Sequence, residues 1–118
     1  MTGNNSRING GGLYNYSSKV DMTNCLLTGN SSDIEEYAGG AAIHNLGGNL
    51  TILDSTIADN TDGTTPAHGK AIASHVWKFP VDSNLVVANS ILYNGGNEIL
   101  TNHPSTVAIT YSDVQGGW

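Results

Sequence analysis

The stretch NLTILDSTIADN, residues 49–60, carries the pattern that decides the fold. Its first half alternates apolar and polar side chains and places Leu50 and Ile52 on one face, which is typical of a strand that buries one side. Asp54 then interrupts the alternation before a second short segment, STI at 55–57. Aspartate tolerates the left-handed backbone of a tight corner, so the stretch predicts two short strands joined by a bend that does not reverse the chain.

The same arrangement recurs along the chain. Segments that match the first half lie at 19–23, 84–88 and 106–110, and segments that match the second half lie at 25–27, 90–92 and 112–114. A third set begins with glycine, has an aliphatic residue in its fourth position and precedes the other two, at 10–15, 40–45, 69–74 and 96–101. Recurrence of this kind is the mark of a repeat architecture. The chain therefore contains four repeats, each with three short strands.

The repeats predict a stack of parallel coils. A corner that turns the chain without reversing it lets each coil lie on the one before, about 4.8 Å away. We expect one all-β domain over 1–118, with coils near 10–30, 40–60, 69–94 and 96–115. The residues between the second and third strands are Asn24, Asp54, Asn89 and Tyr111. The first three are expected to form an Asn ladder, with side chains hydrogen-bonded from coil to coil.

This pattern resembles the right-handed parallel β-helix repeat proteins, whose pectin-lyase-like fold is also used by pectate lyases. The Gly-Gly-aliphatic-x-Asn strands, the stretch at 49–60 and the tail ITYSDVQGGW (109–118) carry the resemblance, and they are similar to repeats of large bacterial secreted and surface proteins. The resemblance implies a right-handed parallel β-helix of about four coils, located outside the bacterial cell or on its surface. Residues 2–4 align with 28–30, inside a coil, which predicts a segment of a longer solenoid.

The composition excludes several classes of partner. The chain of 118 residues has 4 Lys and Arg against 10 Asp and Glu, and its net charge of −6 argues against nucleic acid, which binds clustered basic side chains. No apolar run approaches the roughly 20 residues that cross a bilayer, so we expect neither membrane insertion nor a signal peptide ahead of the repeats. The single cysteine, Cys25, excludes an internal disulfide. It is expected to stack with Ser55, Ser90 and Ser112 as a column of small inward residues.

The first strand of each coil offers one candidate binding surface. If Leu13 and Ile43 point inward, their neighbours Tyr14 and His44 point outward and lie on adjacent coils. These two side chains are a candidate stacking platform for a sugar ring, because the resemblance implies a sugar groove along this face. The alternative is that Tyr14 and His44 are two surface residues without a ligand, because a shared fold does not carry a site.

The third coil offers a second candidate surface. The connection between its first and second strands is longer than in the first two coils and contains the segment HVWKFPVDSN, 75–84. Its His75, Trp77 and Phe79 are candidate ligand contacts, because exposed aromatic residues on a projecting loop suit a sugar or protein ligand. The alternative is that Trp77 and Phe79 fold back and cover the edge or the open end of a coil.

Acidic residues in the connections between coils are the remaining candidates. Asp33, Glu35, Glu36 and Asp62 together offer oxygen ligands of the kind that calcium prefers, although they lack the spacing of a known calcium loop. A solvated acidic edge is the alternative interpretation. The four histidines show no HxH or HExxH spacing, which argues against zinc, and nothing in the pattern indicates a cofactor.

These observations support two functions from different classes. The first is a structural or ligand-presenting β-helix module of a bacterial secreted or surface protein, with carbohydrate as its candidate ligand. The alternative is a polysaccharide lyase or hydrolase, or the non-catalytic part of one. The related enzymes need a basic residue or paired acids at the sugar, and no catalytic residue emerges from the pattern. The unpaired edges of the end coils predict a homo-oligomer.

Overall fold

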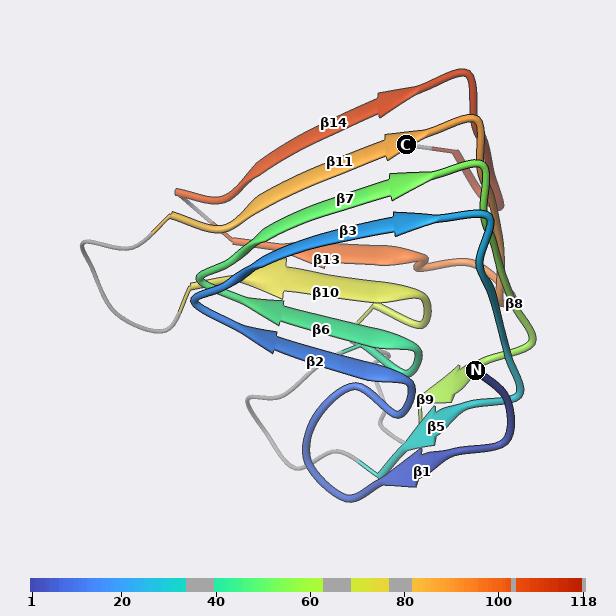
Figure 1. The fold of residues 1–118 in the computed structure, drawn as a ribbon. Coiled ribbons are helices and arrows are strands. Elements are labelled where there is room, and N and C mark those ends of the chain that lie inside the picture. The colour runs from blue at the N-terminus through green and yellow to red at the C-terminus, as the bar shows by residue number, and fades with distance from the viewer. Residues whose placement is uncertain (34–39, 63–68, 77–81, 103, 118) are drawn as a thin grey trace.

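The computed structural model describes residues 1–118 except 34–39, 63–68, 77–81, 103 and 118 (Figure 1). The described residues form fifteen short strands, β1 to β15, and contain no helix. Every pairing between these strands is parallel, so the chain is all-β with parallel sheets, as expected. The described part accordingly has no helix of the length and apolarity that crossing a membrane requires.

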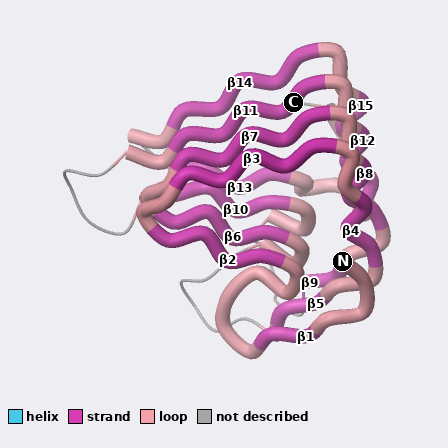
Figure 2. The backbone as a smooth tube through the Cα atoms, in the orientation of Figure 1, coloured by secondary structure: helices cyan, strands magenta, loops and turns pink. Residues whose placement is uncertain are grey.

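Three four-stranded sheets contain the segments that the repeats predict as strands (Figures 1 and 2). The first sheet consists of β2 (Leu13–Tyr16), β6 (Ile43–Leu46), β10 (Ile72–His75) and β13 (Ile99–Thr101). The second consists of β3 (Lys19–Thr23), β7 (Asn49–Leu53), β11 (Asn84–Ala88) and β14 (Thr106–Thr110). The third consists of β4 (Leu26–Thr28), β8 (Thr56–Ala58), β12 (Ile91–Tyr93) and β15 (Asp113–Val114). Every strand in these sheets pairs with its counterpart one repeat away.

A fourth sheet, with three strands, is present that the repeat pattern did not predict. It consists of β1 (Asn5–Ser6), β5 (Ser31–Ser32) and β9 (Thr61–Asp62). Each of these strands has two residues, and all six residues are polar. Strands of this kind have no apolar alternation, which is why the sequence pattern does not reveal them.

The core lies between the three large sheets and is built from the alternating apolar positions. Its buried members are Met22, Leu27, Ala42, Ile43, Leu50, Ile52, Ile57, Ala71, Ile72, Leu85, Val87 and Leu92. A second group packs against them and is only partly buried, namely Leu13, Val20, Cys25, Ile99, Val107, Ile109 and Val114. The register pairs Leu13, Ile43, Ile72 and Ile99 in turn from β2 to β13, which confirms the alignment of the repeats.

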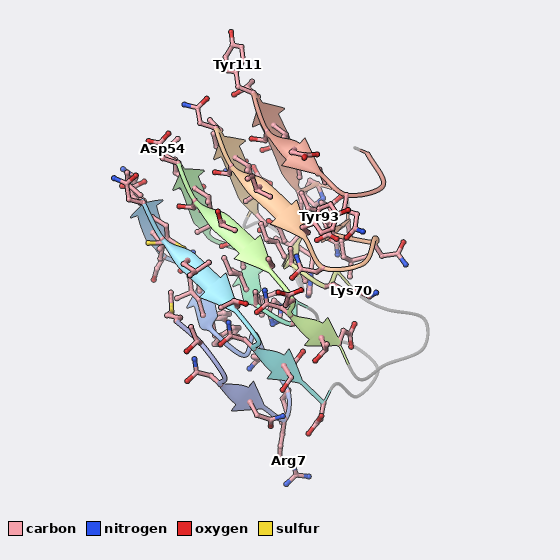
Figure 3. All side chains as sticks on the ribbon, turned by 90° about the vertical axis from the view of Figure 1, so that its right-hand side faces the viewer. Arg7, Asp54, Lys70, Tyr93 and Tyr111 are labelled. Atoms are coloured by element: carbon pink, nitrogen blue, oxygen red, sulfur yellow. The ribbon has the colours of Figure 1, made fainter. Side chains whose placement is uncertain are left out.

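The predicted corners adopt the expected backbone conformation, but the predicted ladder of their side chains is wrong. The φ angles of Asn24, Asp54, Asn89 and Tyr111 are 53°, 50°, 50° and 49°, in the left-handed region. Figure 3 shows Asp54 and Tyr111 projecting outward along the same edge. Within the described residues the side chains of Asn24, Asp54 and Asn89 form no hydrogen bond. The coil-to-coil bond at this corner is made by the backbone, as from Asn24 N–H to Leu53 O at 3.2 Å.

An asparagine ladder does exist, and it follows the third strands. Asn30 Nδ2 donates to Asn60 Oδ1 at 2.9 Å, and Asn60 Nδ2 donates to Asn94 Oδ1 at 2.9 Å. Asn94 Nδ2 then donates to Oε2 of the buried Glu98 at 2.6 Å. Asn30, Asn60 and Asn94 are buried, so these bonds form away from water and satisfy amides that are costly to leave unpaired.

The predicted column of small residues is present. The backbone N–H of Cys25 donates to Ser55 Oγ, that of Ser55 to Ser90 Oγ, and that of Ser90 to Ser112 Oγ, each at 3.1 Å. Cys25 is partly buried and packs against the core. The serine hydroxyls in this column therefore link one repeat to the next just before each strand of the third sheet.

Candidate functional site

The outward face of the first sheet carries a group of aromatic and imidazole rings, which we name the tyrosine–histidine cluster: Tyr14 and Tyr16 on β2, His44 on β6 and His75 on β10. Tyr14 pairs directly with His44, and His44 pairs with Ala73. His75 lies two residues beyond Ala73 and so faces the same way, diagonal to His44. Figure 1 shows the three strands side by side.

The rings of the cluster are in contact. The ring centroids of Tyr14 and His44 are 5.2 Å apart, and those of His44 and His75 are 4.7 Å apart. The Tyr14 and Tyr16 rings are 6.4 Å apart, with 26° between their planes. The structure thus brings together three of the residues that the sequence singles out, Tyr14, His44 and His75, although the first two were predicted on a strand and the third on a loop.

The cluster passes from exposed to buried across the sheet. Tyr14 and Tyr16 are 43% and 63% exposed, whereas His44 and His75 are 2% and 9% exposed. We expected His44 at the surface, and this expectation is wrong. Its side chain does point away from the core, but Tyr14, His75 and the Asn9 side chain all contact it. His44 therefore packs beside the exposed Tyr14 and is itself shielded from solvent.

Hydrogen bonds assign the tautomer of each imidazole. His44 Nδ1 lies 3.0 Å from Asn9 Oδ1, which can only accept, so Nδ1 carries the proton. In the neutral ring His44 Nε2 is then an acceptor, and the His75 Nε2–H donates to it at 3.3 Å. The remaining nitrogen, His75 Nδ1, is buried and has no hydrogen-bond partner in the described part of the chain.

Both imidazoles are neutral at physiological pH. Burial, followed by the proximity of His75, lowers the pKa of His44 from 6.5 to about 4. Burial also lowers the pKa of His75. Burial, with a smaller contribution from Tyr16, raises the pKa of Tyr14, so its hydroxyl stays protonated. The cluster therefore offers uncharged aromatic faces and hydroxyl groups, an arrangement suited to a neutral ligand that carries hydroxyl groups.

The insertion in the third coil is anchored at both ends. Val76 is held by Asn102, whose Oδ1 accepts from the Val76 N–H and whose Nδ2 donates to the Val76 carbonyl, both at 2.9 Å. At the other end Ser83 is buried, and its hydroxyl lies 3.0 Å from Asn45 Nδ2 and from Ser74 Oγ. The candidate ligand contacts Trp77 and Phe79 lie between these anchors and outside the described residues.

The candidate calcium ligands do not form a site in the described part of the chain. Asp33 is exposed, and Asp62 is half-buried in β9. Glu35 and Glu36 lie outside the described residues. Among the residues that the structure describes, no group of three or more His, Cys, Asp or Glu side chains is placed to hold a metal ion.

Two members of the site were not predicted from the sequence. Tyr16 lies two residues after Tyr14, so the alternation of strand side chains would have placed both rings on one face. Asn9 precedes the first strand in an irregular segment, and no periodic signal connects it with His44, thirty-five residues later. Only the fold places its carbonyl against the imidazole.

Comparison of the chain with models of protein families, with curated proteins and with solved structures finds no match. The expected β-helix architecture is therefore supported only by the repeat pattern and by the parallel sheets. The assignment of a role rests on the tyrosine–histidine cluster and its chemistry.

Proposed function

We propose that the chain forms a right-handed parallel β-helix of about four coils and serves as a ligand-presenting module of a bacterial secreted or surface protein, with carbohydrate as its ligand. The repeat-to-repeat pairing within every sheet supports the solenoid. So does the core, which draws equivalent residues from all three large sheets, such as Ile43, Leu50 and Ile57. A stack of this kind offers flat, rigid faces on which side chains of adjacent coils act together.

The observation that carries the ligand-binding role is the exposed pair of Tyr14 and Tyr16. Two neighbouring rings with a small angle between their planes present an apolar surface with hydroxyl groups at its edge. The C–H faces of sugars pack on such rings, and their hydroxyl groups bond to the phenol oxygens. His44 packs against Tyr14 and restricts the motion of this ring before a ligand binds. The conformational entropy lost on binding is therefore smaller.

The charge of the site selects among carbohydrates. The imidazoles of His44 and His75 are neutral at pH 7, and no cationic side chain belongs to the cluster. The chain as a whole carries a net charge of −6. A polyuronate would meet repulsion without a compensating ion pair, so the ligand is a neutral glycan.

A glycan array followed by titration tests this role. We expect the parent chain to bind neutral glycans, and Tyr14→Ala and Tyr16→Ala each to weaken binding about tenfold, which corresponds to about 1.4 kcal/mol. Tyr93→Ala is the matched control, because the exposure of Tyr93, 53%, lies between those of Tyr14 and Tyr16 but the residue is on β12 of the third sheet. Equal affinity of all variants, or no binding by the parent, would contradict the proposal. Release of reducing or unsaturated sugar would instead favour the polysaccharide-active enzyme.

The outermost strands of the large sheets add a second element to the proposal, self-association. Within the described residues β2 and β3 pair on one side only, and so do β13 and β14 at the opposite edge. Unpaired parallel edges accept another strand, so the isolated chain forms dimers or larger assemblies through them. Light scattering over a range of concentrations measures this directly. A stable monomer at high concentration would exclude association through the edges.

A further inference from the structure

The chain contains two Asn-Gly dipeptides, Asn9–Gly10 and Asn94–Gly95. Asparagine followed by glycine is the pair most prone to cyclise, because the glycine amide nitrogen is unhindered and can attack the side-chain carbonyl carbon. Both pairs share this local chemistry, but the fold places them in different surroundings. The comparison between them shows what the fold adds to the dipeptide.

The surroundings of the first pair favour cyclisation at three atoms, namely Asn9 Oδ1, Asn9 Nδ2 and the Gly10 amide nitrogen. Oδ1 accepts a hydrogen bond from His44 Nδ1 at 3.0 Å. Among the described residues nothing bonds to Asn9 Nδ2 or to the Gly10 N–H, so both the leaving group and the attacking nitrogen are free. Gly10 cannot be replaced, because a Cβ there would overlap the Leu13 carbonyl oxygen. The glycine of this dipeptide is therefore required by the fold.

The surroundings of Asn94 oppose the reaction. Its Oδ1 also accepts hydrogen bonds, from Asn60 N–H and Nδ2, but its Nδ2 is held by the Ile57 carbonyl at 2.9 Å and by Glu98 Oε2 at 2.6 Å. The Gly95 N–H donates to Gln115 Oε1. Both the leaving group and the attacking nitrogen of this pair are thus committed to other partners.

We propose that Asn9 is a site of spontaneous conversion to aspartate and isoaspartate, promoted by His44. Solvent hydroxide removes the Gly10 amide proton, and the nitrogen forms a bond to Asn9 Cγ. The His44 Nδ1–H stabilises the negative charge that develops on Oδ1, as a donor in an oxyanion hole does. The Cγ–Nδ2 bond then breaks and ammonia leaves with a proton from water. Water opens the resulting five-membered imide at either carbonyl and yields aspartate or isoaspartate.

The conversion changes the charge of the tyrosine–histidine cluster. In the aspartate product a carboxylate replaces the neutral amide that contacts the His44 ring. A carboxylate at this distance favours the protonated imidazole, so the pKa of His44 rises in the product. When His44 is protonated, its Nε2 donates instead of accepting, so the hydrogen bond between the two rings persists only if His75 changes tautomer and accepts through its own Nε2. Conversion at Asn9 therefore acts as an irreversible change of state in the interior of the candidate site.

Peptide mass spectrometry of the incubated parent chain tests the proposal without any variant. Folded chain and urea-unfolded chain are held at pH 7.5, and the converted fraction at Asn9 and Asn94 is followed in the same digest. In urea both sites react at similar rates, because their local sequences are alike. In the folded chain we expect Asn9 to react at least as fast as in urea and Asn94 to be slowed at least tenfold. Equal protection of the two sites by folding would overturn the proposal.

His44→Phe tests the role of the imidazole, because phenylalanine keeps a ring at this position but has no N–H. We expect this variant to slow conversion at Asn9 about tenfold, equivalent to about 1.4 kcal/mol of barrier. An unchanged rate at Asn9 in a folded variant would overturn the role of His44. The rate at Asn94 shows whether the variant is folded, because an unfolded variant converts Asn94 at the rate measured in urea. If the variant is unfolded, the comparison of folded and urea-unfolded parent chain tests the proposal instead. Asn9→Asp provides the aspartate product, in which NMR titration should show a raised pKa of His44, and an unraised pKa would contradict the change of state.

Discussion

The second and fourth repeats carry similar strands in different surroundings. Ile43 and Ile52 of the second repeat are fully buried, whereas Ile99 and Ile109, the equivalent residues of the fourth, are only partly buried. The strands of the second repeat have a neighbour on both sides in each large sheet, and those of the fourth have one. The residue type is the same in both pairs. Burial in this molecule is therefore set by the place of a repeat in the stack.

This difference has an energetic meaning. In a repeat protein each unit contacts only its neighbours, and stability is close to a sum of unit and interface contributions. The second repeat takes part in two interfaces, which include the core contacts of Leu50 and the ladder bonds of Asn60. Equal chemical changes in the two repeats should consequently have unequal effects, and the following predictions measure that inequality.

The largest effect is expected from truncation of the two equivalent isoleucines. Ile52→Ala should lower the free energy of unfolding by about 3–5 kcal/mol, because it leaves a cavity in a fully enclosed site. Ile109→Ala should cost less than about half as much, because solvent can fill part of the space. Urea denaturation of both variants measures the difference. Equal losses would show that the fourth repeat is as well packed as the second.

Acidification should destabilise the inner repeats, where His44 and His75 lie. Unfolded His44 binds its proton near pH 6.5, and the folded ring does so only near pH 4. Between these values the unfolded chain binds more protons, so stability falls as pH drops below 6.5. At about 1.4 kcal/mol per pKa unit, the loss reaches on the order of 3 kcal/mol near pH 4.

The control for this pH dependence is His44→Gln, which does not titrate. The free energy of unfolding of the parent and of the variant is compared at pH 7.5 and pH 4. The parent should lose more stability than the variant, because carboxylates contribute equally to both. Parallel pH curves for the two proteins would mean that His44 is not held neutral by its surroundings.

The ladder and the corner can be compared within one fold. Asn60→Ala should lower the free energy of unfolding by roughly 2–3 kcal/mol, because it leaves the buried Asn30 N–H and Nδ2 without their acceptor. Asn89→Ala should cost about 1 kcal/mol, because only the left-handed backbone preference is lost. Thermal melts rank the two variants. A larger loss of stability in Asn89→Ala would indicate that the Asn89 side chain forms hydrogen bonds, as the sequence pattern predicted for the corner.

The smallest effect is expected at the corner of the fourth repeat. Tyr111 has a φ of 49° and is 91% exposed, so its ring neither packs nor favours its own backbone conformation. Tyr111→Asn should stabilise the chain by about 0.5 kcal/mol, because asparagine accepts the left-handed region more readily. The reverse change in an inner repeat, Asn89→Tyr, should destabilise by a similar amount. A loss of stability in Tyr111→Asn would mean that the tyrosine has a contact of its own.

Most of the strand arrangement was predictable because it depends on alternating burial. Alternating apolar residues such as Leu50 and Ile52 predict a strand with one buried side, and the recurrence of this pattern predicts the register between strands. The strands Asn5–Ser6 and Ser31–Ser32 were not predictable, because polar pairs carry no such signal. The corner at Asp54 was predictable in conformation but not in bonding, since backbone preference depends on residue type and hydrogen bonding depends on where the side chain points.

The candidate site was predictable only in part, for a related reason. Register alone places Tyr14 beside His44 once the repeats are aligned. The burial of His44 depends on Asn9 and His75, which reach it from outside its own strand pair. Contacts of that kind depend on the path of irregular segments, which no periodicity describes. The tautomers of the two histidines and the pKa of His44 depend on these contacts, so the sequence could not predict them either.

The connection between the first and second sheets shows how such a chain can acquire new surface during evolution. In the first two repeats this connection spans 17–18 and 47–48, and in the third it spans 76–83, yet Asn84 still pairs with Asn49 in register. Lengthening a loop by this amount costs only about 1 kcal/mol of closure entropy, since each doubling adds about 0.6 kcal/mol. Because Val76 and Ser83 are tied to the coils, sequence between them can vary while the strands on either side keep their partners. A set of repeats with such joints can be diversified one connection at a time.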